Sequence, residues 1–188
     1  YSSDTFKIDF QGCAPFGRFR GRSFHDSAVD ISYKDGILEM REISARIYGG
    51  IVAAAGRVTG EGDLFLQVSG LDINLAEIPA APGRGAVGKL QFTGEMHGSI
   101  QSPEYVGQVE VYNAGCFGLS AGRIAGRVQA DYKKIVLDNV VVNAYSGKTV
   151  FTGGIDAPLS EDPRMDLSIK ADLLDVNALS RALRRPVD

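Results

Sequence analysis

The stretch YGGIVAAAG, residues 48–56, and the stretch YSGKTVFTG, residues 145–153, follow the same plan 97 positions apart. Each begins with a tyrosine in a glycine-containing turn and continues as a strand-like run that ends in glycine. The offset aligns Tyr48 with Tyr145, Gly50 with Gly147 and Gly56 with Gly153. A turn signal followed by a strand predicts that the chain reverses closely at each tyrosine.

The match extends upstream of each turn and includes an interruption of the alternating pattern. At the same offset the apolar residues pair as Leu38 with Ile135, Met40 with Leu137, Ile43 with Val140 and Ala45 with Val142. Both copies change phase across a polar pair, at 41–42 and at 138–139. One extra residue moves all following side chains to the other face of a strand, so the shared phase change predicts a shared β-bulge.

The repeat also continues outward with small insertions and deletions. The segment LDIN at 71–74 answers LDVN at 174–177, and Gly12-Cys13 answers Gly115-Cys116. We therefore expect a single segment, residues 1–188, with two approximate repeats at 12–79 and 115–180 that are joined by strands at 86–112.

Alternation of apolar and polar residues runs through most of the chain. In residues 165–173 the odd positions are apolar and the even positions are polar, which is typical of a strand with one dry face and one wet face. Turn signals such as Lys34-Asp35-Gly36 separate these runs at short intervals. We expect an all-β fold of about ten to twelve antiparallel strands. One short C-terminal helix is expected at Asp175–Arg185, with Asp175 as its N-cap.

Composition narrows the classes of function. The 188 residues are 44% hydrophobic and 23% charged, with a formal net charge of −3. A sequence-independent nucleic-acid binder would be basic, so this charge argues against nucleic acid as a partner. No apolar run approaches the ~20 residues that span a bilayer. The chain begins with Tyr1 rather than methionine, and we expect it to be a segment of a longer protein.

The repeated unit carries a family resemblance. An apolar strand, a Tyr-Gly-Gly or Tyr-Ser-Gly turn, a strand ending in glycine and a strand closing on LDIN or LDVN together resemble the AsmA-like clan, and the TamB family in particular. The stretch GEMHGSIQSPEYVG at 94–107 is similar to a phrase that recurs in this family, in which one strand ends and the next begins after a proline. The resemblance runs from residue 12 to residue 183.

The resemblance implies a long antiparallel sheet curled into an open half-barrel, the β-taco, with an apolar concave face. It implies a non-enzymatic protein anchored in the inner membrane of a diderm bacterium and crossing the periplasm, or a plastid-envelope homologue. Its groove would carry phospholipid between the inner and outer membranes and support outer-membrane biogenesis. The implied partners are phospholipid acyl chains, further repeats of the same chain and an outer-membrane assembly protein of the BamA/TamA type. The family supplies no catalytic residue, cofactor or metal to carry over.

The residues of the dry face point in the same direction. Many are glycine or alanine, which permit tight curling or leave volume along a groove. Large apolar side chains are interspersed, and each would forgo roughly 1.5–3 kcal/mol if it stayed in water. The residues we expect to line the groove are Leu64, Leu66, Val68, Leu90, Phe92, Phe151, Leu167 and Ile169. The alternative is a closed sandwich or barrel with glycine-rich bends and a small-ligand site.

Motifs for catalysis, cofactors or metals are weak. The stretch GRGAVG at 83–88 fits GxGxxG, but it runs into an alternating strand rather than a helix and predicts a turn. His97 is expected on the wet face of its strand and His25 in a polar loop, neither with a second ligand at metal spacing. Cys13 and Cys116 are expected to be small buried hydrophobic residues.

Two surface features leave an alternative function open. Arg18, Arg20 and Arg22 alternate on one strand face, which could contact anionic headgroups or an acidic partner, or be solvated. The edges of an open sheet would offer unpaired backbone groups to another strand. The alternative function is therefore a protein-binding scaffold that assists outer-membrane protein (autotransporter) assembly by β-augmentation.

Overall fold

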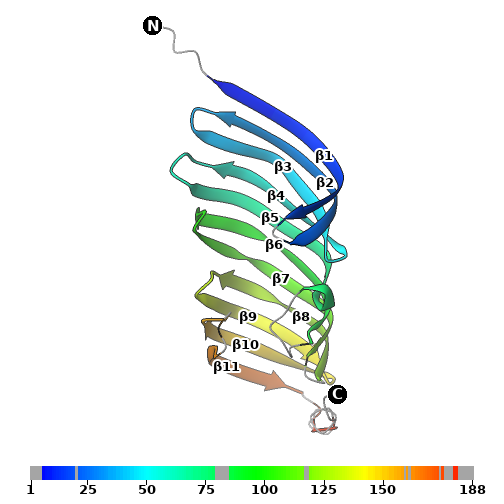
Figure 1. Cartoon of the computed structure of the whole chain (residues 1–188). Coiled ribbons are helices and arrows are strands. Elements are labelled where there is room, and N and C mark those ends of the chain that lie inside the picture. Colours follow the sequence, from blue (N-terminus) through cyan, green and yellow to red (C-terminus); the bar gives the residue numbers. More distant parts are fainter. Residues whose placement is uncertain are drawn as a thin grey trace.

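The computed structural model describes residues 6–19, 21–78, 85–116, 119–158, 160, 162–173, 175 and 180–181, without the side chain of Cys116. These residues form eleven strands in one antiparallel sheet whose spatial order is the chain order (Figure 1). The strands are β1 (Lys7–Phe19), β2 (Arg22–Lys34), β3 (Ile37–Ile47), β4 (Gly50–Val58), β5 (Asp63–Asn74), β6 (Val87–Ser99), β7 (Ser102–Cys116), β8 (Leu119–Ala130), β9 (Lys134–Ala144), β10 (Gly147–Asp156) and β11 (Arg164–Asp172). The predicted all-β fold and number of strands are confirmed.

Helical structure is sparse in the described part of the chain. A single 3-10 turn, η1 (Leu75–Glu77), follows β5, and Asn74 caps it by accepting a hydrogen bond from the Ala76 N–H. The predicted helix at Asp175–Arg185 lies outside the described residues except for Asp175 and the helical pair Ser180 and Arg181.

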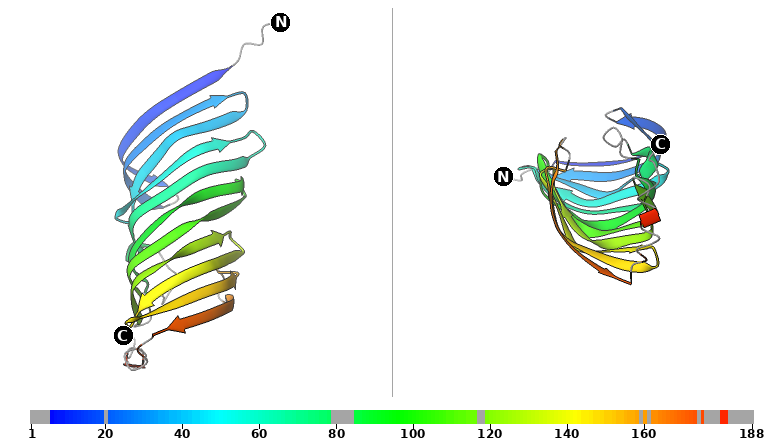
Figure 2. Two further views of the ribbon diagram at one scale, coloured as in Figure 1. Left: turned by 180° about the vertical axis from the view of Figure 1, so that it is seen from behind. Right: turned by 90° about the horizontal axis from the view of Figure 1, so that it is seen from below.

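The sheet is elongated and curved into an open trough. Viewed from below, its strands bend around a hollow that stays open on one side (Figure 2). β1 and β11 form the two ends and do not pair with each other. The predicted elongated, curved antiparallel sheet is confirmed. The alternative of a closed sandwich or barrel is wrong for the described residues, because all eleven strands belong to one sheet that does not close.

Both tyrosine-containing turns are tight reversals. Tyr48 and Gly49 have φ of 51° and 71°, and Tyr145 and Ser146 have φ of 49° and 59°. Two successive positive φ values in a two-residue hairpin loop define a type I′ turn, whose twist matches that of the flanking strands. The predicted close reversal at each tyrosine is confirmed.

The predicted β-bulge is present in both hairpins. In β3 the pair 41–42 opposes Ala55 alone, and in β9 the pair 138–139 opposes Thr152 alone. The extra residue allows the apolar side chains on both sides of the bulge to share one face of the sheet. The limits of the two repeats stay a prediction.

The match between LDIN and LDVN is wrong by two residues. The Asn74 N–H donates to the Tyr48 carbonyl at 2.8 Å, and the Asp175 N–H donates to the Tyr145 carbonyl at 3.1 Å. Asp175 therefore takes the place of Asn74, whereas the sequence comparison aligned it with Asp72. The error arises because aligned letters do not reveal which backbone groups are paired.

Strand register puts the apolar residues on one face. One unbroken row of directly paired residues crosses all eleven strands: Phe10, Ile31, Met40, Gly56, Leu66, Met96, Tyr105, Ala130, Ile135, Ile155 and Met165. The neighbouring row is equally apolar: Gly12, Val29, Ile43, Ala54, Val68, Gly94, Gly107, Val128, Leu137, Gly153 and Leu167. Directly paired residues lie on the same face, so these rows define a continuous apolar surface.

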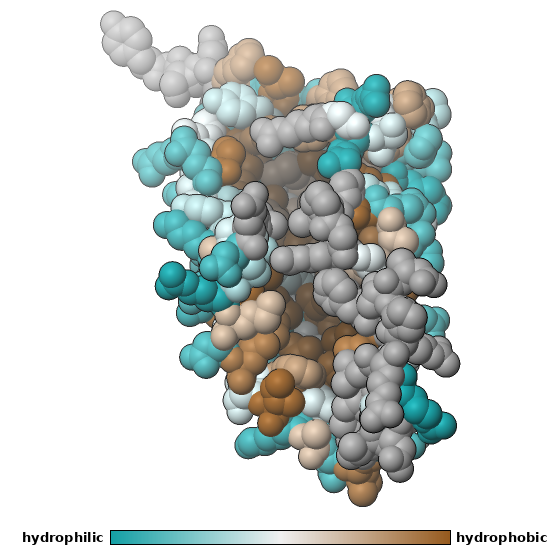
Figure 3. Space-filling model, turned by 60° about the horizontal axis from the view of Figure 1, so that its bottom comes forward, coloured by the Kyte–Doolittle hydropathy of each residue, from teal (hydrophilic) through white to brown (hydrophobic). Residues whose placement is uncertain are grey.

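This surface lines the inside of the trough. The space-filling view shows hydrophobic residues within the hollow and hydrophilic ones along its outer flanks (Figure 3). Among the described residues only five apolar side chains are buried, and none is completely enclosed: Met40, Leu64, Ile73, Ala114 and Val140. A single sheet has no second layer to pack against, so most of its apolar face stays half-buried.

Candidate functional site

All eight residues predicted to line a groove lie on the concave face. Leu66, Val68 and Leu167 belong to the two apolar rows, and the others are in register with them. Leu64 is buried, six residues are half-buried, and Ile169 on the end strand β11 is 58% exposed. The sequence therefore assigned the face of each residue, because period-two alternation fixes it.

A distinct apolar hollow of about 540 Å³ lies on the part of this face from β6 to β11. Its walls include Val111 of β7, Ile124 of β8, Val142 of β9, Phe151 of β10 and Ile169 of β11. We call it the apolar hollow. Of the eight predicted residues only Phe151 and Ile169 line it. Val111, Ile124 and Val142 follow the same alternation, but sequence spacing did not show where along the trough the hollow would form.

The apolar hollow is bordered by few polar groups. Leu75 of η1 also lines it, which brings the turn after β5 to its margin. The Tyr145 hydroxyl accepts a hydrogen bond of 3.2 Å from the Ser120 N–H, and both residues line the hollow together with Thr149. With these few hydroxyl groups at its margin, the hollow favours apolar ligands held by contact area rather than by directed bonds.

Several glycines on the concave face are covered by aromatic rings. A Cβ atom on Gly70 would collide with the Phe92 ring, and one on Gly94 or Gly107 would collide with Tyr105. The Phe92 and Tyr105 rings meet edge to face, with centroids 6.0 Å apart. The expectation that small residues leave volume is therefore wrong at Gly94 and Gly107, because Tyr105 and the backbone of the adjacent strand occupy it.

Two other glycines serve curvature. Gly56 and Gly153 have φ of 142° and 140°, and a Cβ on either would strike the backbone of the adjacent strand. Both lie beside the two β-bulges, at equivalent places in the two hairpins. Here the alternative interpretation, that glycine permits tight curling, agrees with the structure.

The Tyr105 side chain is held against the sheet by hydrogen bonds from its hydroxyl group to the backbone. The hydroxyl oxygen lies 3.1 Å from the carbonyl oxygens of both Thr93 and Gln108, which share its single hydrogen. Partial burial raises the pKa of Tyr105 above its ordinary value, because the ionised form would lose hydration. The phenol therefore stays a hydrogen-bond donor at neutral pH.

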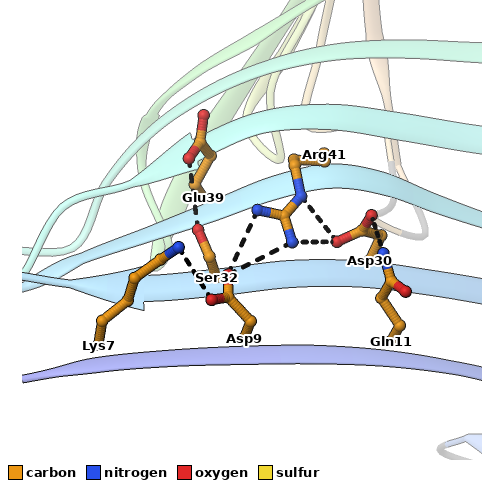
Figure 4. Close-up of polar contacts among 7 residues, drawn as sticks. All are labelled: Lys7, Asp9, Gln11, Asp30, Ser32, Glu39 and Arg41. Carbon is orange, nitrogen blue, oxygen red and sulfur yellow. Dashed lines mark hydrogen bonds and ion pairs between the residues drawn. The ribbon is translucent and has the colours of Figure 1, made fainter.

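The convex face carries a polar cluster centred on the bulge residue Arg41 (Figure 4). Its Nε donates to Asp30 at 2.7 Å, and its Nη1 lies 3.4 Å from an oxygen of Asp9, so one guanidinium joins β1, β2 and β3. The hydrogen bond from Arg41, followed by one from Gln11, lowers the pKa of Asp30. The pKa of Asp9 is lowered first by Lys7. These groups pair with one another and leave no unsatisfied charge for a ligand.

The second repeat reverses the signs at the same places. Arg127 stands 97 positions after Asp30, and Asp138 stands 97 positions after Arg41. Arg127 and Asp138 are directly paired between β8 and β9. The two positions thus carry opposite charges in both repeats, but the acidic and the basic residue have exchanged places.

The histidines and cysteines do not form a reactive site in the described residues. His97 is exposed on the convex face as predicted, with Nδ1 3.2 Å from the Glu104 carbonyl oxygen. His25 lies within β2 rather than in a loop, with its ring 5.3 Å from that of Phe16. The expectation that Cys13 is buried is wrong, because the register places it on the convex face of the end strand β1, where it is exposed. The side chain of Cys116 lies outside the described residues.

The predicted arginine stripe is divided by a turn. Arg18 belongs to β1, whereas Arg22 begins β2, so the two do not lie on one strand face as expected, and Arg20 lies outside the described residues. The glycine motif at 83–88 is described only from residue 85 onward, where it runs into β6.

Within the described residues no group of three or more His, Cys, Asp or Glu side chains is placed to hold a metal ion. No described helix has the length and apolar character to cross a bilayer. The fold defines an open antiparallel β-trough with an apolar interior. Comparison with protein-family models, with curated proteins and with solved structures finds no match for this chain.

Proposed function

We propose that this chain is a non-enzymatic segment of a TamB/AsmA-like protein of the periplasm, anchored in the inner membrane, whose concave face carries phospholipid between the inner and outer membranes. The observation that carries the proposal is the apolar surface that continues across all eleven strands. A monomeric protein rarely leaves so large an apolar surface without a partner.

Acyl chains suit this surface because apolar burial has no direction. Roughly 25 cal/mol is gained per Å² of apolar area removed from water, wherever along the trough the contact is made. A chain can therefore shift from Phe92 toward Phe151 and Ile169 without breaking specific bonds. The charged headgroup stays in water at the open side of the trough.

Site-specific photocrosslinking tests the proposal. Phe92 on the concave face and Phe65 on the convex face are each replaced by p-benzoylphenylalanine, and the proteins are incubated with vesicles of phosphatidylethanolamine and phosphatidylglycerol. Phe65 is the matched control, because it is also an aromatic residue and is 49% exposed. The carbon atom of the Arg57 guanidinium lies 5.2 Å from the centroid of its ring. We expect lipid adducts at position 92 and not at position 65. Equal labelling at both positions would overturn the proposal.

The alternative function is a scaffold that assists outer-membrane protein assembly by β-augmentation. The outer edges of β1 and β11, which pair with no further strand among the described residues, favour it. Its partner would be a strand of an outer-membrane protein or an assembly protein of the BamA/TamA type. Proline substitution at Ile8 of β1 or Leu167 of β11 would weaken such binding. Unchanged binding of an unfolded outer-membrane protein by both variants would exclude this function.

A further inference from the structure

The two outermost strands of the described sheet run in the same direction. Eleven strands alternate in direction, so β1 and β11 are parallel to each other. If two copies lie side by side with their apolar faces on the same side of a continued sheet, β11 of one copy would meet β1 of the other as a parallel pair. By contrast, β11 meets β11, or β1 meets β1, as an antiparallel pair related by a two-fold axis perpendicular to the sheet.

The β11 edge is better suited to strand addition than the β1 edge. Pro15 interrupts β1 and supplies no N–H, which is a common way to prevent strand addition at an edge. β11, with the sequence RMDLSIKAD, contains neither proline nor glycine. The β11 edge therefore has the features of a strand that can accept another strand.

The sequence of β11 is complementary to itself in antiparallel pairing. With Ser168 on the two-fold axis, Arg164 faces Asp172 of the second copy and Asp166 faces Lys170 of the second copy. These positions lie on the convex face, and they give four opposite-charge contacts in the dimer. On the concave face Met165 would face Ala171, and Leu167 would face Ile169.

Only this register satisfies both faces. A shift of one residue places apolar side chains opposite polar ones. A shift of two residues in one direction places Arg164 opposite Lys170, and in the other direction it places Asp166 opposite Asp172. Like charges directly opposite each other destabilise a strand pair, so charge selects the register centred on Ser168.

The groups that would form this contact are exposed. Arg164, Asp166, Lys170 and Asp172 have no ion pair or side-chain hydrogen bond among the described residues. On the other face Met165 is 63% exposed and Ile169 is 58% exposed. A second β11 strand would cover both of these side chains and pair the four charges.

We propose that the protein self-associates through β11, forming a two-fold symmetric dimer in which one antiparallel sheet and one apolar concave face continue from copy to copy. The proposal does not rest on lipid binding. It adds a partner, a second copy of this chain, whose described strands would continue the trough beyond β11.

Charge exchange at the edge tests the dimer. Sedimentation velocity over a range of concentrations is expected to show a monomer–dimer equilibrium for the purified chain. Asp166→Lys alone and Lys170→Asp alone each create two like-charge contacts and should raise the dissociation constant roughly ten-fold. An equimolar mixture of the two variants should regain the dimer, because each Lys then faces an Asp. Recovery in the mixture also shows that both variants are folded.

A disulfide reports the register directly. In a Cys13→Ser/Cys116→Ser background, Ser168→Cys lies opposite itself across the axis and should form an intermolecular disulfide under mild oxidation. Lys170→Cys lies opposite Asp166 and should not. A purified chain that is monomeric at every concentration, dimers that ignore the charge changes, or equal crosslinking at 168 and 170 would each overturn the proposal.

Discussion

Tyr105 lies over Gly107, and its hydroxyl group occupies the place that a side chain at position 107 would take. The Tyr105 hydroxyl reaches across to the backbone carbonyls of Thr93 and Gln108. The glycine thus gives the concave face a flat aromatic patch in place of a gap.

Gly107→Ala should destabilise the protein. The added Cβ would collide with the Tyr105 hydroxyl and with the Thr93 carbonyl oxygen, which forces a shift in the sheet. We expect the free energy of unfolding in urea to fall by about 1–3 kcal/mol. Gly122→Ala is the control, since its Cβ would meet no atom closer than 3.9 Å. Equal effects of the two substitutions would contradict this account of Gly107.

Ser146→Gly should stabilise the protein by roughly 1 kcal/mol, because Ser146 has a φ of 59° and glycine adopts that conformation without steric cost. The first hairpin already has glycine at the equivalent position, Gly49, with a φ of 71°. The reverse change, Gly49→Ser, should lower stability by a similar amount. Thermal unfolding of both variants checks this, and a melting temperature lowered by Ser146→Gly would contradict it.

Acid should weaken the link between β1, β2 and β3. The pKa values of Asp30 and Asp9 lie below their ordinary value of 3.8 in the folded state. A carboxyl with a lowered folded-state pKa contributes stability that is full above about pH 4 and is lost as the pH falls through the folded-state pKa. The urea concentration at the midpoint of unfolding should fall between pH 7 and roughly pH 3. Arg41→Gln should make this fall smaller.

Arg57→Gln is the control for the acid experiment. Arg57 is also exposed on the convex face, but it stacks on Phe65 and makes no ion pair among the described residues. Its replacement should leave the pH dependence as in the unaltered protein. Identical pH profiles for Arg41→Gln and Arg57→Gln would show that the cluster around Arg41 does not govern acid stability.

Ile169→Asp should abolish lipid retention at the apolar hollow while the sheet stays folded. Ile169 lines the hollow yet is 58% exposed, so a carboxylate there is hydrated and disrupts apolar contact more than folding. Phe65→Asp makes a matched change at a similarly exposed position on the convex face. Native mass spectrometry after incubation with phosphatidylglycerol should show bound lipid for Phe65→Asp only. Equal lipid binding by both variants would count against the concave face.

Local features of this chain could be predicted where neighbouring residues specify them. The bulges at 41–42 and 138–139 were visible as a phase change, since a strand has a strict period of two. The alignment of Asp175 with Asp72 failed, because the hydrogen bond from the Asp175 N–H to the Tyr145 carbonyl joins groups that lie far apart in the sequence. Cys13 was misjudged because its burial depends on the face and the strand it occupies, and it lies on the convex face of the end strand β1.

The sequence by itself determined the strands, the two hairpin turns and the face on which each of the eight groove residues lies. Alternation and turn chemistry act over a few residues, so short segments of the sequence are enough to predict these features. Only the tertiary structure decided that the sheet stays open, that Phe92 and Tyr105 cover the glycines, and that the apolar hollow forms from β6 to β11. Curvature depends on the close approach of adjacent strands at Gly56 and Gly153, and such contacts follow from packing rather than from the pattern of residues along the chain.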